Sequence, residues 1–357
     1  MSAPVLAVVV LQYGRWRDTV TCLQSLVPAV RAGLARVIVV DNASPDDSAA
    51  RVRGWIHGGC TGTARPVHDT VASHWWPLDG DPDATWQLLD DDQEAPPRAA
   101  PWAFVTSGDN RGFAAGMNTG IRVALSDARV DAVWLLNNDT VVDGPCVQAI
   151  RAALDAAPAT VGQFGTTVCY YDRPTIVQSV GWCRWNAWLA TSQRLHDGAS
   201  LAQPLSRIPT PPGYVYGASW VIRAAALRTV GLLNEESFLY GEELDWSCRA
   251  RGWSTRLVAE AVVWHREGAT IGAGVRAVQA RSELADLCGI SARLRLTRRF
   301  FPGRLPAVYS SLFGAALNRL RRGDRRRAAA VARLVLAGGL PAPRPTAATD
   351  HPSSSPP

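Results

Sequence analysis

In the first 140 residues, continuous apolar runs alternate with segments in which apolar residues have helical spacing. Residues 5–11 form an unbroken β-branched and aliphatic run, which predicts a central parallel strand buried on both faces. Residues 18–27 then place apolar side chains at helical spacing. Strands are expected at 5–11, 36–40, 103–106 and 132–136, a helix at 18–27, and a loop followed by a helix at 112–125. This alternation predicts an α/β sheet whose functional groups gather at the carboxyl ends of its strands.

Two polar stretches interrupt this pattern. After the second strand, Ser44 can cap a helix that has Pro45 in its first turn. Residues 58–101 are rich in Trp, Pro and Asp without clear periodicity, and they are expected to form an inserted surface loop. This loop either shapes a binding pocket or packs over the sheet. The acidic run at 90–92 is more typical of a solvated face than of a metal site.

The last third of the chain differs in character from residues 1–275, which we interpret as the main domain. Further strands are expected within 161–188, and a helix at 224–230 that ends at Gly231. Residues 276–338 read as an Arg-rich helical extension, and residues 339–357 as a disordered tail rich in Pro, Ala and Ser. The basic residues suit either an interfacial element that contacts anionic lipid headgroups or a helical cap with a solvated arginine face.

Composition narrows the class of protein. The net charge of +6 over 357 residues suits an anionic partner without choosing among nucleic acid, membrane and phosphorylated substrate. Seven scattered cysteines contain no CxxC pair, so neither a disulfide framework nor a zinc site is indicated, and a reducing compartment is expected. The apolar run at 5–11 is too short for a signal sequence or a membrane span. A soluble or peripheral protein is expected, without a nucleic-acid-binding motif.

Five separated segments resemble, in order and spacing, glycosyltransferase family 2, the GT-A enzymes that include bacterial rhamnosyltransferases. A further match is Trp264-His265, and the resemblance covers most of residues 5–272. The five segments are Val8-Val9-Val10-Leu11-Gln12-Tyr13-Gly14, Val39-Val40-Asp41-Asn42-Ala43-Ser44, Asn110-Arg111-Gly112-Phe113-Ala114-Ala115-Gly116-Met117-Asn118, Leu135-Leu136-Asn137-Asn138-Asp139 and Phe238-Leu239-Tyr240-Gly241-Glu242-Glu243-Leu244-Asp245-Trp246. The resemblance implies a GT-A fold, a Rossmann-like mixed sheet flanked by helices, here with a helical C-terminal extension.

At the first two strand ends, the resemblance implies contacts with the nucleotide of a sugar donor. Asp41 closes the second strand, where its carboxylate can accept a hydrogen bond from a base or ribose, although an Asp before Asn-Ala-Ser also suits a turn. Gln12 and Tyr13 would flank the same base. Family members more often have Asn-Tyr-Asn here, so Gln12 and Gly14 depart from the pattern.

Further along the chain, the resemblance implies diphosphate and metal contacts. Arg111 and Asn118 flank a loop of small residues before a helix, a setting that suits anions. Asn137 and Asn138 are expected to contact the nucleotide-sugar; the motif Asn137-Asn138-Asp139 takes the place of the family's DxD. The implied ligands of Mg²⁺ or Mn²⁺ are Asp139 and His265.

The segment around residues 241–246 carries the expected catalytic group. Transfer with inversion by single displacement needs a base within reach of the acceptor hydroxyl. The family generally shows Glu-Asp-x-Asp, with the Asp of the first pair as base, and Glu243 takes that position here. Glu242 is the rival base, and Asp245 is expected to orient or cap a helix beginning near Leu244. An acidic helix N-terminus stabilised by the dipole is the structural alternative.

The function expected from this resemblance is metal-dependent, inverting hexosyl transfer. L-rhamnose or another deoxysugar from a dTDP-sugar is favoured, with an envelope glycan or lipid-linked saccharide as acceptor. A small natural product as acceptor is the first alternative, and a non-catalytic protein that binds sugar nucleotides is the second. The chain is expected in the cytoplasm, with peripheral contact to the inner face of the plasma membrane through the Arg-rich extension.

Overall fold

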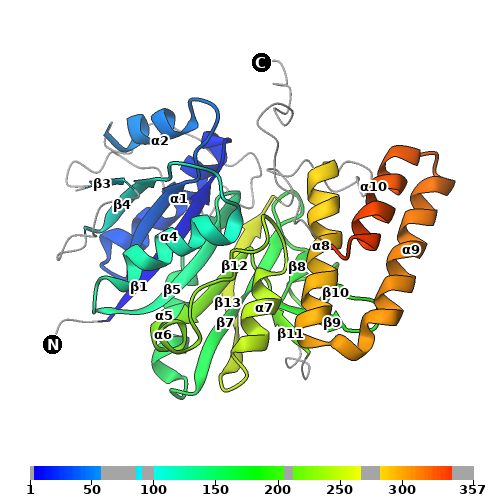
Figure 1. Cartoon of the computed structure of the whole chain (residues 1–357). Helices are drawn as coiled ribbons and strands as arrows, with labels where there is room; N and C mark the ends of the chain where they lie inside the picture. The colour runs from blue at the N-terminus through cyan, green and yellow to red at the C-terminus, as the bar shows by residue number, and fades with distance from the viewer. Residues whose placement is uncertain (1–3, 58–85, 91–99, 205–211, 267–281, 340–357) are drawn as a thin grey trace.

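The computed structural model describes residues 4–57, 86–90, 100–204, 212–266 and 282–339, with the backbone alone at 86–90. A large mixed sheet forms the centre of the molecule, and a bundle of helices stands at one side of it (Figure 1). The strands are β1 Val5–Gln12, β2 Ala35–Asp41, β3 Trp86–Asp90, β4 Trp102–Thr106, β5 Val130–Asn137, β6 Thr140–Val142, β7 Val161–Tyr170, β8 Val177–Ser179, β9 Trp182–Asn186, β10 Thr191–Arg194, β11 Gly213–Val215, β12 Ser219–Arg223 and β13 Ser254–His265.

The helices expected at 18–27 and within 112–125 are present, whereas the helix at 146–156 was not expected. The helices are α1 Trp16–Arg31, α2 Ser48–His57, α4 Phe113–Leu125, α5 Cys146–Ala156, α6 Ala224–Val230, α7 Glu242–Arg249, α8 Glu283–Phe300, the 3₁₀ turn η1 Pro302–Arg304, α9 Leu305–Arg321 and α10 Arg325–Leu336. Helix α6 ends at Gly231, whose φ of 89° is one that residues other than glycine rarely adopt. None of the helices in these described ranges combines the length and the apolar character that crossing a membrane requires.

Strand order in the central sheet is β3-β4-β2-β1-β5-β12-β7-β13-β6, with β8 paired to β7. The first five strands of that order run parallel, as the pattern of strands and helices predicted. Strand β12 is antiparallel to both β5 and β7, while β13 is parallel to β7 and antiparallel to β6. The candidate residues lie at, or just after, the ends of strands β1, β2, β5 and β13.

Both faces of the sheet are buried, which explains the unbroken apolar run of β1. Leu6, Val8 and Val10 join the apolar cluster on the side of α1 and α5, whereas Ala7 and Val9 join the cluster under α4 and α6. Successive side chains of a strand point to opposite faces, so a strand covered by helices on both sides needs an apolar residue at every position.

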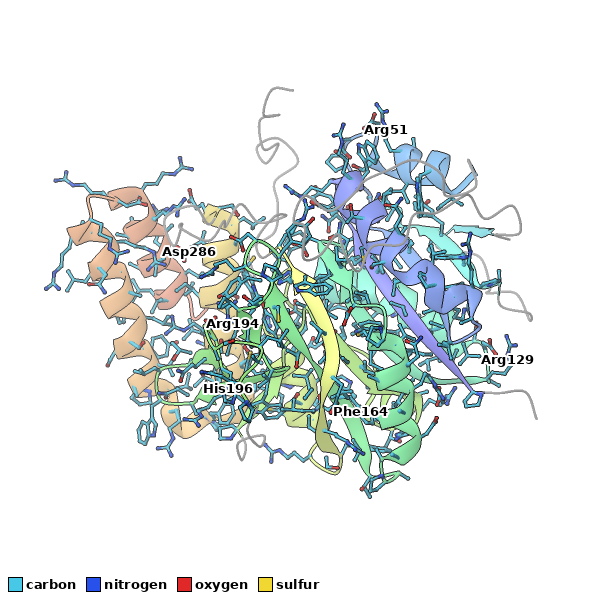
Figure 2. The ribbon with its side chains drawn as sticks, turned by 180° about the vertical axis from the view of Figure 1, so that it is seen from behind. Arg51, Arg129, Phe164, Arg194, His196 and Asp286 are labelled. Carbon is cyan, nitrogen blue, oxygen red and sulfur yellow. The ribbon has the colours of Figure 1, made fainter. Side chains whose placement is uncertain are left out.

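A small second sheet, β10-β9-β11, connects the central sheet with the C-terminal helices. Helices α8, α9 and α10 pack together, and Arg319 of α9 forms a bidentate ion pair with Asp286 of α8. Seen from behind in Figure 2, Arg194 and His196 lie between Asp286 of this bundle and Phe164 of the central sheet. The arginine-rich extension is therefore packed on the rest of the chain through the small sheet.

Two local expectations were wrong. Residues 86–90, expected within a loop, form the edge strand β3, which pairs in parallel with β4; most of the remaining insert, including residues 91–92, lies outside the described residues. Ser44 does not cap a helix, because α2 begins at Ser48 and the Ser44 hydroxyl donates to Asp41 instead. The expected tail at 339–357 lies outside the described residues except for Gly339.

Candidate functional site

Gln12 and Asp41 lie opposite each other at the ends of β1 and β2. Both are buried, and Gln12 Nε2 donates to Asp41 Oδ1 at 2.8 Å. Asp41 also accepts from the backbone N and the hydroxyl of Ser44, at 3.0 and 2.6 Å, so its carboxylate builds the turn that follows β2. Gln12 Oε1 has no hydrogen-bond donor among the described residues. A buried acceptor oxygen at this strand end can accept a hydrogen bond from an N–H of a bound base.

Tyr13 and Asn138 differ in the burial and contacts of their side chains. Tyr13 is half-buried directly after β1. The side chain of Asn138 is buried and donates to the hydroxyl of Thr19 on α1 at 2.9 Å. Asn138 therefore ties the end of β5 to α1, so we leave it out of the proposed donor site.

Asn137, Asp139 and His265 come together from the ends of β5 and β13. His265 Nε2 lies 3.2 Å from Asp139 Oδ1 and 3.4 Å from Asn137 Nδ2. Asp139 and His265 are both buried, and His265 stands opposite Thr140 in the β13–β6 pair. His265 lies more than 120 positions after Asn137 and Asp139 in the sequence, and the sheet brings the three residues into one cluster.

The proton on His265 is directed by Gln178, a buried residue of β8 that sequence reasoning did not select. His265 Nδ1 donates to Gln178 Oε1 at 2.8 Å, and the hydroxyl of Tyr216 donates to the same oxygen at 3.3 Å. This fixes the proton on Nδ1 and turns Nε2 towards Asp139. A histidine that binds a metal is commonly held in this way, with its second nitrogen donating to a carbonyl oxygen.

The donor set fits a divalent cation between Asp139 and His265. Because Nδ1 carries a proton, Nε2 and the carboxylate oxygen face each other as two acceptors unless a proton or a cation lies between them. Burial favours a higher pKa for Asp139, but the charge and hydrogen bond of His265 outweigh it and hold that pKa below its ordinary value. No group of three or more His, Cys, Asp or Glu residues suited to a metal occurs in the described ranges. Two protein ligands leave further coordination positions to oxygens of a bound substrate or water.

Two arginines border this cluster, and sequence reasoning missed both. Arg15 and Arg266 form ion pairs with the same buried carboxylate, Asp18, at 2.6 and 2.7 Å. The backbone N of Arg266 donates to Asp139 O at 3.0 Å, and the charge of Arg15 also favours the ionised form of Asp139. The signal was the position of each arginine, directly after a strand end that carries candidate residues.

The structure places Arg111 and Asn118 against another loop. Asn118 exchanges hydrogen bonds with the backbone N and O of Leu233, both at 2.9 Å, and donates to Glu235 at 2.8 Å. Arg111 pairs with Glu235 at 2.7 Å. Asn118 is buried and its amide holds residues 233–235 in place, so we leave Arg111 and Asn118 out of the proposed donor site.

Helix α7 begins with the two glutamates that the sequence singled out. The side chain of Glu243 lies against Gly217, where an added β-carbon would overlap its carboxylate. Burial raises the pKa of Glu243 above its ordinary value. Burial, and then the neighbouring charge of Glu243, raise the pKa of Glu242 to about 8. Two adjacent carboxyls with raised pKa values are the arrangement expected of a proton acceptor near neutral pH.

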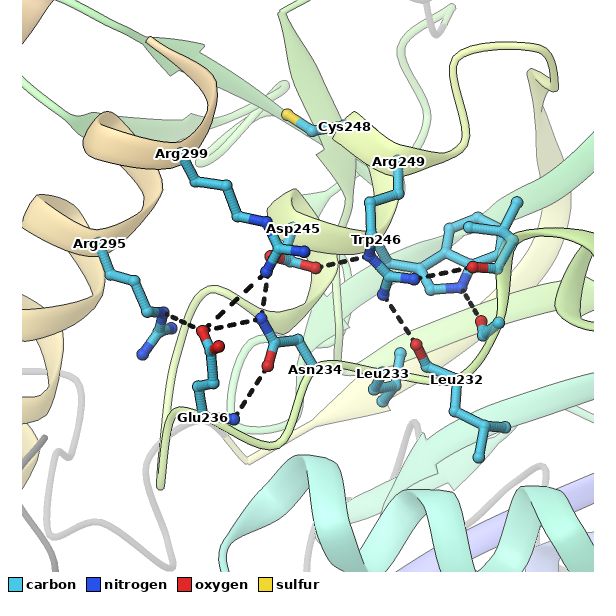
Figure 3. Close-up of polar contacts among 12 residues, drawn as sticks. Leu232, Leu233, Asn234, Glu236, Asp245, Trp246, Cys248, Arg249, Arg295 and Arg299 are labelled. Carbon is cyan, nitrogen blue, oxygen red and sulfur yellow. Dashed lines mark hydrogen bonds and ion pairs between the residues drawn. The ribbon is translucent and has the colours of Figure 1, made fainter. Parts of the chain in front are cut away.

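Asp245 has a positioning role rather than a capping one. Helix α7 starts at Glu242 with Gly241 before it, so the expected cap by Asp245 is wrong. The Asp245 carboxylate accepts from Arg249 at 2.7 Å and from Asn234 at 3.2 Å, and it pairs with Arg299 at 3.1 Å (Figure 3). These contacts join α7 to α8 and to the loop before α7.

Residues 216–218 contact both the Asp139–His265 cluster and Glu243. The Tyr216 ring packs edge-on against the His265 ring at 6.2 Å, and Gly217 adjoins Glu243. The next residue, Ala218, accepts a hydrogen bond from the backbone N of Asn137 at 3.1 Å. Three consecutive residues therefore hold the Asp139–His265 cluster and Glu243 on either side of a single turn of chain.

One family model matches part of the chain. Residues 78–203 match the family model Glycosyl transferase family 2. The match covers about a third of the chain, contains Asp139 and Gln178 and ends before α7, so the roles of Glu242 and Glu243 rest on their contacts alone.

The individual relatives have low sequence identity to this chain. The low-salt glycan biosynthesis hexosyltransferase Agl10 of Haloferax volcanii is 24% identical over 157 residues, 42% of this chain and 46% of the relative. The chain thus spans less than half the length of that curated relative. The crystal structure of GalNAc-T7 with UDP, GalNAc and Mn²⁺ has a TM-score of 0.51 at 12% identity, over 83% of this chain and 48% of that chain.

Another solved structure has a lower similarity score. It is the mannosyltransferase PcManGT from Pyrobaculum calidifontis with GDP-Man and Mn²⁺, which has a TM-score of 0.46 at 14% identity, over 94% of this chain and 81% of that chain. The mixed sheet flanked by helices, together with the family model and the GalNAc-T7 likeness, confirms the expected GT-A-like glycosyltransferase fold with helices at its C-terminal end.

Proposed function

We propose that this protein is an inverting glycosyltransferase that transfers a hexose from a nucleotide diphosphate-sugar to an acceptor hydroxyl. The observation that carries this proposal is the segment 216–218, whose consecutive residues contact His265, Glu243 and Asn137. A transferase of this kind needs a proton acceptor for the incoming hydroxyl and a cationic site for the departing diphosphate, and these must be close together.

In this proposal, Glu243 is the base. Its carboxylate accepts the proton of the acceptor hydroxyl as the oxygen attacks the anomeric carbon, and a single displacement inverts that centre. Burial makes the carboxylate more basic than an exposed one, which matches its pKa to the task. Gly217 leaves the space in which Glu243 lies.

At the donor end, Asp139 and His265 would hold Mg²⁺ or Mn²⁺, and Gln178 would orient His265. The bound cation would neutralise charge that develops on the diphosphate. Arg15 and Arg266 stand beside this position and can add hydrogen bonds to phosphate oxygens. Gln12, with its unmatched acceptor oxygen, would contact the base, next to Tyr13 and Asp41.

We also propose a donor class and an acceptor class, both on the sequence resemblance. The first donor to test is dTDP-L-rhamnose, ahead of other deoxysugars, and the first acceptor is an envelope glycan or lipid-linked saccharide. A small natural product is the alternative acceptor. The proposal is tested by incubating the full chain with UDP-, GDP- and dTDP-sugars and Mn²⁺, and measuring release of the nucleoside diphosphate with and without lipid-linked saccharide. Release from one nucleotide class, abolished in Glu243→Gln, supports transfer; no release from any donor rejects it.

Peripheral contact with an anionic membrane is part of the same proposal, and an exposed apolar stripe on α9 supports it. Phe313, Leu317 and Leu320 form an exposed apolar stripe along α9, each more than 40% exposed, and the exposed Arg321 and Arg322 follow at its end. An apolar stripe beside arginines suits the boundary between headgroups and acyl chains. The four arginines of α8 instead make contacts within the protein, namely Arg293, Arg295, Arg298 and Arg299.

Vesicle sedimentation tests this contact. The full chain should sediment with phosphatidylglycerol vesicles and remain in solution with phosphatidylcholine vesicles. Leu317→Asp should abolish sedimentation, and Leu336→Asp, an exposed leucine of α10 outside the stripe, should not. Sedimentation that survives Leu317→Asp would reject the stripe as the contact surface.

A further inference from the structure

Helix α8 packs directly on the first turn of α7, the helix that carries the proposed base (Figure 1). A β-carbon on Gly241 would lie 2.8 Å from Leu296 Cδ1 and 3.5 Å from Ala292 Cβ, so α8 covers the residue just before α7. Leu244, in the first turn of α7, belongs to the same apolar cluster as Leu296. The start of α7 is therefore packed against the C-terminal extension.

The proposed base leaves α7 on another side. Positions 241, 244 and 245 are three or four apart, so they share the side of α7 that faces α8. Glu243 lies instead against Gly217. Helix α7 is thus held between α8 and the segment that contains Gly217, and a shift of its first turn would move the Glu243 carboxylate.

Asp245 is the charged residue on the side that faces α8. Its side chain is 2% exposed, and its carboxylate accepts from Arg249 Nε at 2.7 Å and from Asn234 Nδ2 at 3.2 Å. Arg299 Nη1 lies 3.1 Å from the same carboxylate (Figure 3). Arg249 is on α7 and Asn234 is in the loop before it, so Arg299 is the partner that reaches Asp245 from the C-terminal extension. Burying a carboxylate is costly unless such partners stabilise it.

The backbone of Asp245 belongs to the turn that carries the two glutamates. Its N donates to Gly241 O at 2.9 Å, which closes the turn around Glu242 and Glu243. The side chain of Asp245 joins this turn to Arg299, and Gly241 joins it to Leu296. Loss of Arg299 would release the polar half of this contact and leave the apolar half in place.

We propose that Arg299 is a positioning residue for catalysis: its ion pair with Asp245 fixes the first turn of α7, so that Glu243 lies where the acceptor hydroxyl arrives. The C-terminal extension is then a part of the active site. This inference rests on the proposed function for its catalytic consequence, whereas the effect of Arg299 on α7 does not depend on that function.

The first arm of the test uses no substrate. Amide hydrogen exchange of the full chain is followed at residues 245–249 in wild type, Arg299→Met and Arg299→Lys. These amides donate within α7 and exchange when the helix opens. Arg299→Met should raise their exchange rate about fivefold, the scale of an ion pair lost at a partly exposed site. Arg299→Lys should restore most of the protection, because an ammonium group can keep one contact with Asp245.

Arg298→Met is the matched control. It removes the neighbouring exposed arginine of α8, which donates to the Tyr309 hydroxyl at 2.7 Å and to Gly338 O within the helical bundle. It should lower Tm by an amount similar to that of Arg299→Met and leave exchange in α7 unchanged. Unchanged exchange in Arg299→Met, or an equal increase in Arg298→Met, would overturn the proposal.

Glu236→Gln separates the two carboxylates that Arg299 meets. Glu236 lies 4.0 Å from Arg299 Nη1 and is 63% exposed, whereas Asp245 is closer and buried. Exchange in α7 should therefore remain at the wild-type rate in Glu236→Gln. An increase equal to that of Arg299→Met would assign the effect to Glu236 and overturn the role of the Asp245 pair.

The second arm measures sugar transfer at saturating donor and acceptor. Arg299→Met should lower kcat by at least about 10-fold, since a misplacement of about 1 Å can cost about 100-fold. The Kd for nucleoside diphosphate with Mn²⁺ should stay unchanged, because the donor site lies away from α8. Arg299→Lys should regain most of kcat, and Arg298→Met should keep it. In an Asp245→Asn background, Arg299→Met should lower kcat no further.

The comparison of kcat values decides the catalytic role. Equal kcat values for Arg299→Met and Arg298→Met would overturn it, and so would a further loss in the Asp245→Asn background. If wild type transfers no sugar, the proposed function fails and the catalytic role of Arg299 fails with it, whereas hydrogen exchange still decides whether Arg299 fixes α7.

Discussion

Glu243 lies against Gly217, and the space that glycine leaves is filled by the glutamate carboxylate. Gly217 stands between Tyr216, which packs on His265, and Ala218, which accepts a hydrogen bond from Asn137 N. The position of the proposed base relative to the proposed metal ligands is thus set by one glycine. This relationship leads to the first prediction.

Gly217→Ala should displace the Glu243 side chain without unfolding the protein. The added methyl group would overlap the carboxylate, which is the end of a flexible side chain and can move away. A displacement of about 1 Å can lower kcat about 100-fold. Donor binding should be unchanged, as judged by nucleotide titration. Gly252→Ala is the matched control, since nothing lies within 4 Å of a β-carbon there; equal kcat values for the two variants would contradict the account.

The pH dependence of transfer should report the two glutamates. The base must be ionised, and burial raises the pKa of Glu243, so kcat/KM should fall as pH decreases through that raised pKa. Glu243→Gln should lower kcat by about 100-fold to 10,000-fold and remove this acid limb. The profile is measured with saturating donor. An acid limb that persists in Glu243→Gln and disappears in Glu242→Gln would make Glu242 the base.

Gln178 should matter for metal binding although it lies outside the cluster. Its carbonyl oxygen accepts from His265 Nδ1 at 2.8 Å and thereby orients the ring with Nε2 towards Asp139. Gln178→Leu should weaken Mn²⁺ affinity by about 10-fold to 100-fold, as expected for loss of a group that orients a ligand. Titration of Mn²⁺ in the presence of a nucleoside diphosphate measures this. Unchanged affinity would show that His265 does not bind the metal.

Asn118 should contribute to stability and leave donor binding unchanged. Its amide satisfies the backbone N and O of Leu233 in a buried position. Asn118→Ala should lower the free energy of unfolding by about 2 kcal/mol, because buried polar groups lose their partners. Thr119→Ala, its half-buried neighbour on α4, is the control in denaturant unfolding. A loss of nucleotide affinity in Asn118→Ala, with unchanged stability, would restore the nucleotide role that the sequence resemblance implied.

The fold could be predicted from the sequence where the spacing of apolar residues reflects which side chains are buried. The unbroken apolar run of β1 reflects a strand covered on both faces, and the limits of α6 follow from Gly231. The edge strand β3 was missed because its residues stand in a Trp-, Pro- and Asp-rich insert without alternation. The prediction that Ser44 caps a helix was wrong because the dipeptide Ser-Pro does not show that the Ser44 hydroxyl donates a hydrogen bond to Asp41.

The candidate site was predictable only in part, because motifs select residues without showing their partners. Asp139 and Asn137 lie within hydrogen-bond distance of His265, and Glu243 lies against Gly217. Contacts that depend on tertiary pairing left no signal in the local sequence. Such contacts include the hydrogen bond from His265 to Gln178 and the ion pair of Asp245 with Arg299, which lies on a helix about 50 residues further along the chain.

The most direct test of the central claim is a thermal-shift titration of the full chain with UDP-, GDP- and dTDP-sugars, with and without Mn²⁺, in wild type and Asp139→Asn. One nucleotide class should stabilise wild type only with Mn²⁺, by about 2.7 kcal/mol at a concentration 100-fold above Kd. Asp139→Asn should lose that stabilisation. Stabilisation by no nucleotide-sugar, or equal stabilisation of wild type and Asp139→Asn, would contradict the assignment of this site to a sugar-nucleotide donor.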